Sequence, residues 1–324
     1  MSKPETKTPQ LKNDFIRVFA KTEVSVLIAL LILCAVLSLL SPYFLKTQNI
    51  FNVLRQFSLI GILAVGEALI IITGGIDLSI GAVVGLTACM AALFTSHGLD
   101  PFTVVLFTML IGGLAGAVNG FFVTKVGINP FIVTMGMSSI ARGTTLLITD
   151  GLPIDFQSSL TCLGSGYIGP VPVPVIIMFL VVAAGFIFAN NSLLGRNVYA
   201  VGNNERAAVL SGIRVNGIKA MVYIITGVLA AISGIILAGN LNNADPSFGT
   251  GYEMDIIAAV VIGGVSLAGG EGSILGVIVG AAIMGVIRNA FVLLGISAYW
   301  QVVTIGVVII AAVSIDSLRR KKKN

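Results

Sequence analysis

Residues 190–219 read NNSLLGRNVYAVGNNERAAVLSGIRVNGIK, the longest polar interruption in a chain that is otherwise almost entirely apolar. The stretch carries four basic residues against the single acid Glu205; the basic residues are Arg196, Arg206, Arg214 and Lys219. Long apolar runs precede and follow it, so we expect a loop between membrane spans. Because Lys and Arg accumulate in cytoplasmic loops, the charge of this loop predicts a cytoplasmic location.

A short helix is predicted inside this loop. Asn203 and Asn204 are suited to cap a helix N-terminus, and Glu205 is favourably placed in the first turn. Gly212 is expected to end the helix shortly after Leu210. Such a helix could dock into a groove on a partner, and a merely solvated loop is the alternative.

The pattern Glu205-x-Ala207-Ala208-x3-Gly212 resembles the E-A-A…G coupling loop of ABC-importer permeases, from which Arg206 is one departure. Four wider pieces resemble the ribose-type sugar permeases of bacteria: GGIDLSIG, residues 195–219, GTGYEMDIIAAVVIGGVSLAGG and LLGISAYWQ. Together they extend the resemblance over nearly the whole chain. It implies that the residues coupling the chain to an ATPase are Asn204, Glu205, Arg206, Ala207, Ala208, Ser211 and Gly212.

The resemblance also implies partners and a cargo. It implies a second permease copy, identical or homologous, a separate ATP-binding subunit that holds ATP and Mg²⁺, and an extracytoplasmic sugar-binding protein. The implied substrate is a monosaccharide, with ribose favoured. Another solute of an ABC permease is an alternative (a galactoside, xylose, inositol, a furanosyl signal or a nucleoside). A stand-alone secondary transporter and a membrane scaffold without transport are further alternatives.

Composition independently predicts an all-α, polytopic membrane protein. Hydrophobic residues make up 56% of the chain, charged residues 10%, and the mean hydropathy is +1.02, whereas a soluble domain has about a quarter charged residues. The sequence pI of about 9.2 is attributed to cytoplasmic flanks, so no nucleic acid partner is expected. Three cysteines without paired spacing and a single histidine predict no metal site.

No catalytic or nucleotide-binding motif occurs in the sequence. It contains no G-x-x-x-x-G-K-[ST] loop, so ATP is expected on a separate chain and no cofactor on this one. It also contains no nucleophile–base constellation, so we predict a permease rather than an enzyme.

Apolar runs predict about ten transmembrane helices, since a span needs roughly 20 apolar residues. They also divide the chain into a cytoplasmic N-terminal segment, residues 1–23, a permease domain, residues 24–318, and a basic cytoplasmic tail, residues 319–324. The predicted spans are 24–40, 57–73, 81–96, 102–123, 131–149, 171–189, 220–239, 256–270, 273–291 and 299–315.

The basic residues support one orientation of these spans. Fifteen of the 19 Lys and Arg residues fall on the predicted inner side, Arg142 and Arg288 fall in or beside spans, and only Lys46 and Arg55 fall outside. The outer segments 97–101, 150–170 and 240–255 contain no base. We therefore predict a multi-pass protein of the bacterial cytoplasmic (inner) membrane with both termini cytoplasmic, the basic tail also facing the lipid bilayer.

Two polar interruptions need an interpretation. Residues 41–56 are too polar to span and predict a short interfacial helix. Residues 74–81, GGIDLSIG, break an apolar run, and they predict either a broken helix that lines a cavity or a tight cytoplasmic turn, which the spacing slightly favours.

Three ionisable residues are candidates for a translocation path. Arg142 lies within the predicted span 131–149, and Asp77 and Glu67 lie in or near spans, so we expect these acids to be its partners. The alternative is a structural ion pair, or an arginine that reaches a span end.

Small residues predict close helix packing. Gly112, Gly116 and Gly120 recur every four positions, as do Gly276 and Gly280, which favours packing within one subunit over a dimer seam. IITGGIDLS at 71–79 is similar to VVIGGVSLA at 260–268, and NGFFVTKVGINPF at 119–131 to NAFVLLGISAYW at 289–300. These pairs predict an internal pseudo-repeat, with chance similarity as the alternative.

Overall fold

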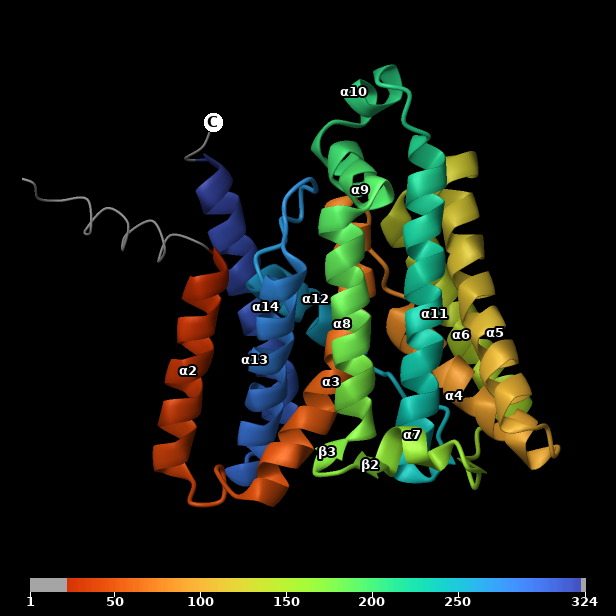
Figure 1. Cartoon of the computed structure of the whole chain (residues 1–324), viewed down its shortest axis with the longest axis vertical. Helices are drawn as coiled ribbons and strands as arrows, with labels where there is room; N and C mark the ends of the chain where they lie inside the picture. The colour runs from red at the N-terminus through yellow and green to blue at the C-terminus, as the bar shows by residue number, and fades with distance from the viewer. Residues whose placement is uncertain (1–21, 322–324) are drawn as a thin grey trace, which may run out of the picture.

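The computed structural model describes residues 22–321, and they form a bundle of roughly parallel and antiparallel helices (Figure 1). Predictions for residues 1–21 and 322–324 lie outside the described residues. The helices are α2 (Thr22–Leu40), α3 (Thr47–Ile72), α4 (Ile80–Ser96), α5 (Pro101–Phe121), the π-helix η1 (Phe122–Val126), α6 (Pro130–Thr149), α7 (Thr161–Ser165), α8 (Val173–Asn191), α9 (Leu193–Asn203), α10 (Glu205–Leu210), α11 (Val215–Leu241), α12 (Tyr252–Ile262), α13 (Ile274–Leu293) and α14 (Ala298–Lys321).

Four two-residue strands complete the fold. β1 (Ile154–Asp155) pairs antiparallel with β4 (Asn243–Ala244), and β2 (Tyr167–Ile168) pairs with β3 (Val171–Pro172). These pairs help to build a layer with α7 at one end of the bundle, which we call the α7 end (Figure 1). The opposite end carries α9, α10, the beginning of α2 and the end of α14, and we call it the α10 end.

Seven helices of the described residues are long and apolar enough to cross a membrane. This finding confirms the all-α, multi-pass membrane class. The predicted eighth span, 256–270, is wrong because α12 has only 11 residues and ends at Ile262. The glycine pair Gly263–Gly264 ends it, and the φ of +92° at Gly264 is one that residues with a Cβ avoid.

The prediction of an interfacial helix over residues 41–56 is also wrong. Residues 41–46 turn at the α7 end, and Thr47 begins α3, which continues without interruption to Ile72. Residues 57–72 of this helix are all buried, so α3 is a central helix of the bundle. Its polar first turns are continuous with a core helix rather than a separate anchor.

Glycines bring helix backbones into direct contact. A Cβ on Gly112 of α5 would lie 2.2 Å from the carbonyl oxygen of Gly227 of α11, and a Cβ on Gly116 would lie 2.1 Å from that of Tyr223. A Cβ on Gly120 would lie 2.9 Å from the Cα of Ala220. The first glycine stripe therefore packs α5 against α11 within one chain.

The second pair of glycines does the same for α12 and α13. Cβ atoms on Gly276 and Gly280 would lie 2.1 Å and 2.0 Å from the carbonyl oxygens of Gly263 and Ala259. This contact holds the last turn of the short helix α12 against a long neighbouring helix. The stripe thus fixes the position of a helix that is too short to span a bilayer alone.

The polar segment after α3 is a buried break. Thr73, Asp77 and Ser79 are at most 4% exposed, and the chain turns back into the bundle before α4 begins (Figure 1). Residues 73–79 thus form a short, partly buried connection in which Asp77 and Ser79 are internal and Gly74 is exposed. Non-helical backbone at membrane depth is tolerated where it is packed in protein, and here it lies between α3, α4 and the neighbouring helices.

The two pairs of similar segments in the sequence occupy different places in the fold. In the first pair, α3 and α12 both end at or beside a glycine pair, and Gly74 and Gly264 have left-handed backbones. Two helices, α4 and α5, lie between residues 71–79 and residues 119–131. Only α13 lies between the similar residues 260–268 and residues 289–300. The second pair therefore lies at opposite ends of the bundle, and the two similarities do not share one register.

Candidate functional site

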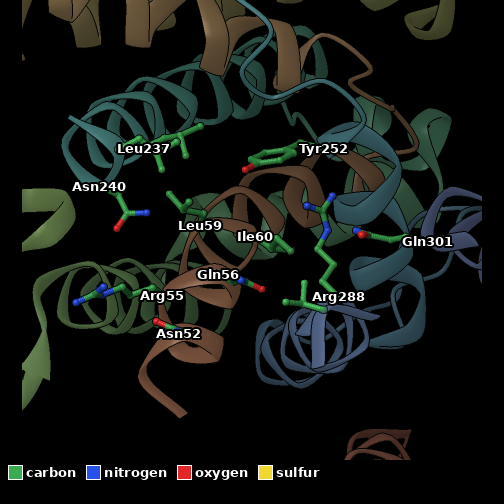
Figure 2. A pocket seen from close by; sticks show the side chains of 12 residues that line it. Asn52, Arg55, Gln56, Leu59, Ile60, Leu237, Asn240, Tyr252, Arg288 and Gln301 are labelled. Atoms are coloured by element: carbon green, nitrogen blue, oxygen red, sulfur yellow. The ribbon is translucent and has the colours of Figure 1, made fainter. Parts of the chain in front are cut away.

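A polar cavity of about 350 Å³ opens at the α7 end of the bundle (Figure 2). The first turns of α3 contribute Asn52, Arg55 and Gln56, and the last turn of α11 contributes Asn240. Tyr252, Arg288 and Gln301 come from α12, α13 and α14. Leu59, Ile60 and Leu237 provide apolar surface between these polar groups.

The arrangement follows from where each helix carries its polar residues. The polar start of α3, which the sequence alone did not place, faces this cavity, while its apolar continuation forms the core. Asn240 projects into the space from α11, near Leu237 and Leu59, and Arg288 projects beside Tyr252 and Gln301 (Figure 2). A concave site with apolar walls and a few polar groups is typical of small-molecule binding.

An ion pair lies at one side of the cavity. The Arg288 guanidinium pairs with the Asp255 carboxylate and lies over the Tyr252 ring, 5.3 Å from its centroid. Asp255 is 0% exposed, so the expectation that it belongs to an outer loop is wrong. A buried carboxylate needs such a partner because an unpaired buried charge is strongly destabilising. An arginine in one apolar run and an acid at the start of another are the signal that sequence reasoning missed.

A second arginine, Arg55, joins the cavity to the layer at the α7 end. The Arg55 guanidinium lies 4.8 Å from the centroid of the Tyr167 ring and donates a hydrogen bond to its hydroxyl. Phe51 packs edge-on against the same ring, with 6.2 Å between centroids. Since Tyr167 belongs to β2, these contacts join α3 to the layer formed by residues 150–172.

Glu67 and Asp77 do not line the cavity but form a buried polar cluster with Ser79 and Asn119. A Glu67 carboxylate oxygen accepts from the Asp77 backbone N–H at 3.1 Å, and an Asp77 oxygen accepts from the Ser79 N–H at 2.8 Å and hydroxyl at 2.5 Å. The Asn119 amide donates to the Ser79 hydroxyl at 2.9 Å. The cluster stabilises the break between α3 and α4.

Arg142 does not pair with Glu67 or Asp77, so the predicted partners are wrong. Its guanidinium donates to the backbone carbonyls of Pro246 and Phe248, the latter at 2.9 Å. These residues belong to the non-helical segment between β4 and α12. Backbone carbonyls in such a segment have no ladder partner, and a guanidinium with five donors satisfies two of them at once.

The same segment packs on a glycine face of α4. A Cβ on Gly81 would lie 2.3 Å from the carbonyl oxygen of Gly249, and a Cβ on Gly85 would lie 2.6 Å from that of Phe248. Arg142 thus holds the non-helical segment between β4 and α12 against α4 at the two positions, Gly81 and Gly85, that have no side chain. Its role is to support the wall beside α12 rather than to provide a free charge in a path.

At the other end of the molecule, α10 has the predicted limits. Its residues are Glu205–Leu210, the Asn204 side chain accepts from the Ala207 N–H at 3.0 Å, and Gly212 has a φ of +80°. Glu205 pairs with Lys219 of α11 at 2.6 Å. Arg206, Ala207 and Ser211 are exposed, so they are available to a partner.

Ala208 is an exception, because its side chain is only 4% exposed and belongs to the hydrophobic core of this chain. The expectation that it faces a partner's groove is therefore wrong. The exposed apolar residues of α10 are instead Val209, at 58%, and Leu210, at 89%. A six-residue helix turns only some positions outward, and the motif alone does not say which.

Beneath α10, three segments meet with their backbones in contact. A Cβ on Gly202 at the end of α9 would lie 1.7 Å from the Ile72 carbonyl oxygen, and the Gly270 N–H donates to that oxygen at 2.9 Å. The Tyr199 hydroxyl donates to the Gly272 carbonyl at 3.1 Å. We call Ile72, Gly202 and Gly270 the glycine junction. It joins α9 to the end of α3 and to the segment that follows α12.

The described residues form a multi-pass helical bundle with a cavity at one end and a capped, exposed helix at the other, an architecture that suits a membrane transport protein. The chain belongs to the family described as the branched-chain amino acid transport system / permease component, whose model matches residues 49–313.

Curated relatives cover almost the whole chain. It is 44% identical to the ribose import permease protein RbsC of Escherichia coli K12 over 299 residues, 91% of this chain and 93% of the relative. It is 42% identical to RbsC of Haemophilus influenzae, with the same coverage of both chains, and 40% identical to RbsC of Bacillus subtilis, covering 98% and 99%. A solved inward-facing transporter of the metal-chelate ABC type is 17% identical, with a TM-score of 0.47, and the match covers 82% of this chain and 89% of that one.

Proposed function

We propose that this chain is the membrane-spanning permease subunit of an ATP-driven ABC importer of a monosaccharide, with ribose as the favoured cargo. The observation that carries the proposal is identity of 40–44% to ribose import permeases over at least nine-tenths of the chain. Identity to the D-allose and the galactose/methyl galactoside permeases of Escherichia coli is lower, at 39% and 35%. This order favours ribose over the other sugars.

The partner ATPase is proposed to dock on α10 and to hold the ATP and Mg²⁺. Support comes from the exposed apolar side chains of Val209 and Leu210, which are presented on a helix capped at both ends. Motion of α10 would reach the bundle through the glycine junction, because α9 is in backbone contact with the end of α3. The permease itself would be non-catalytic.

An exported sugar-binding protein is proposed to dock at the α7 end, on the layer that surrounds the cavity. With α10 facing an ATPase, this end faces outward, and both termini lie in the cytoplasm of a bacterium with the bundle in its inner membrane. A second permease copy would complete the transporter. The basic residues of the α10 end, among them Arg196, Arg206 and Arg214, support this orientation.

Reconstitution tests the proposal. The permease is co-expressed with candidate ATPase and binding-protein subunits from the same genome, and the ATPase is co-purified through a tag on the permease. We expect a stable complex whose ATPase activity rises when the sugar-loaded binding protein is added. A permease that purifies without an ATPase and moves sugar in response to an ion gradient would instead identify a secondary transporter.

A further inference from the structure

The cavity at the α7 end combines the chemical groups that bind uncharged sugars. The side-chain amides of Gln56 and Asn240 each offer donors and an acceptor, which is what a hydroxyl group requires. Tyr252 provides an aromatic face and a polar hydroxyl on the same side chain. Leu59 and Leu237 supply apolar surface for the carbon face of a ring.

The two arginines of the lining are both engaged by other side chains. Arg288 lines the space, but the buried carboxylate of Asp255 pairs with it. The pair leaves guanidinium N–H groups as donors while its own net charge is zero. Arg55, the other arginine of the lining, is engaged with the ring and hydroxyl of Tyr167. The hydroxyl groups of a sugar require directed donors and acceptors, and the side-chain amides and the paired Arg288 of the lining supply them.

We propose that this cavity is a binding site for a neutral monosaccharide in transit, which rests on the proposed function. Gln56, Asn240 and Arg288 hydrogen-bond to its hydroxyls, and Tyr252 packs against the ring. Asp255 is a positioning residue, since it is buried and acts through Arg288. The volume of about 350 Å³ lies within the range of roughly 300–1,000 Å³ that is usual for small-molecule sites.

Sugar protection of a cysteine tests this site on the purified full-length permease, without ATP or transport. Cys34, Cys89 and Cys162 are first replaced by serine or alanine. Leu241→Cys then places a thiol in the lining without removing a proposed ligand, and Gln157→Cys places a control thiol on the exposed outer layer. A thiol reagent is added over a series of ribose concentrations, and the rate of alkylation is measured.

We expect ribose to slow alkylation at position 241 but not at position 157. At ten times the dissociation constant about one site in ten is empty, so the rate at position 241 falls about tenfold. Equal rates with and without ribose at position 241, or the same slowing at both positions, would overturn the proposal.

Substitutions at Tyr252 test how the sugar is held. In the Leu241→Cys background, Tyr252→Phe keeps the aromatic face and should retain protection, whereas Tyr252→Leu should lose most of it. Gln56→Ala, at an exposed position of α3, should weaken protection without disturbing the core. Unchanged alkylation rates in the absence of sugar establish that each variant is folded. Retention of full protection in both Tyr252→Leu and Gln56→Ala would refute these roles.

This test and that of the proposed function fail separately. If the reconstituted complex imports ribose but ribose does not protect position 241, the cavity proposal is wrong and the function stands. If ribose protects position 241 but no ATPase associates, the site stands and the proposed function is wrong.

Discussion

Substituting Gly202 by alanine should uncouple α10, the proposed ATPase-docking helix, from the bundle. The new Cβ would lie 1.7 Å from the Ile72 carbonyl oxygen and 2.6 Å from the Gly270 nitrogen, and both are backbone atoms that cannot rotate away. Either α9 moves or the Gly270–Ile72 hydrogen bond breaks. Overpacking of this kind costs about 1–3 kcal/mol, and loss of the bond adds about 1 kcal/mol.

The assay compares wild type, Gly202→Ala and a matched control, Gly217→Ala, in co-purification and in vesicle uptake. Gly217 lies on α11 close to the same loop, but a Cβ there has its nearest neighbour at 3.8 Å. We expect Gly202→Ala to keep the ATPase bound, since α10 itself is unchanged, and to reduce sugar uptake per ATP hydrolysed at least fivefold. The control should match wild type.

Wild-type uptake and wild-type thermal stability in Gly202→Ala would refute this reasoning. That result would mean that the contact between α9 and α3 yields without consequence. Loss of uptake in Gly217→Ala as well would point to a general sensitivity of the loop rather than to the glycine junction.

Three further predictions follow from the described contacts. In intact cells a membrane-impermeant thiol reagent should label the exposed native Cys162 but not Ser211→Cys beside α10; labelling of the latter would reverse the orientation. Leu210→Asp should weaken co-purification of the ATPase at least tenfold without lowering permease stability. Ala208→Trp should instead lower permease stability by about 1–3 kcal/mol, because the Ala208 side chain is internal. If both variants weakened co-purification equally and neither lowered stability, the burial of Ala208 would be contradicted. Arg142→Ala should leave two carbonyls unsatisfied and reduce both thermal stability and uptake, at a cost of about 1–3 kcal/mol per orphaned group, and Arg142→Gln should recover part of the loss; normal stability in the alanine variant would show that the carbonyls find other partners.

Local features of the structure followed from the sequence, because their causes are local. The limits of α10 depend on an asparagine cap and on a glycine with a left-handed backbone, and both are visible within nine residues. The direction in which Ala208 points was not predictable, since it depends on how α9 and α11 flank the short helix. A motif identifies such a helix without fixing its rotation.

The candidate site was beyond sequence reasoning for a different reason. Arg288 and Asp255 are 33 residues apart, and their pairing depends on the packing of α12 against α13. The polar first turns of α3 resembled an interfacial helix because the sequence does not reveal that they face a cavity. Likewise, Arg142 was expected to seek a carboxylate, whereas the non-helical segment after β4 offered it backbone carbonyls.

The most direct test of the account is ribose accumulation in proteoliposomes that contain the permease and its ATPase. The binding protein is supplied on one side of the membrane and ATP on the other. We predict accumulation that requires both ATP and the binding protein and that disappears when the catalytic residue of the ATPase is mutated. Accumulation of the same size without ATP, or with the mutated ATPase, would contradict the claim that this chain is the permease of an ATP-driven sugar importer.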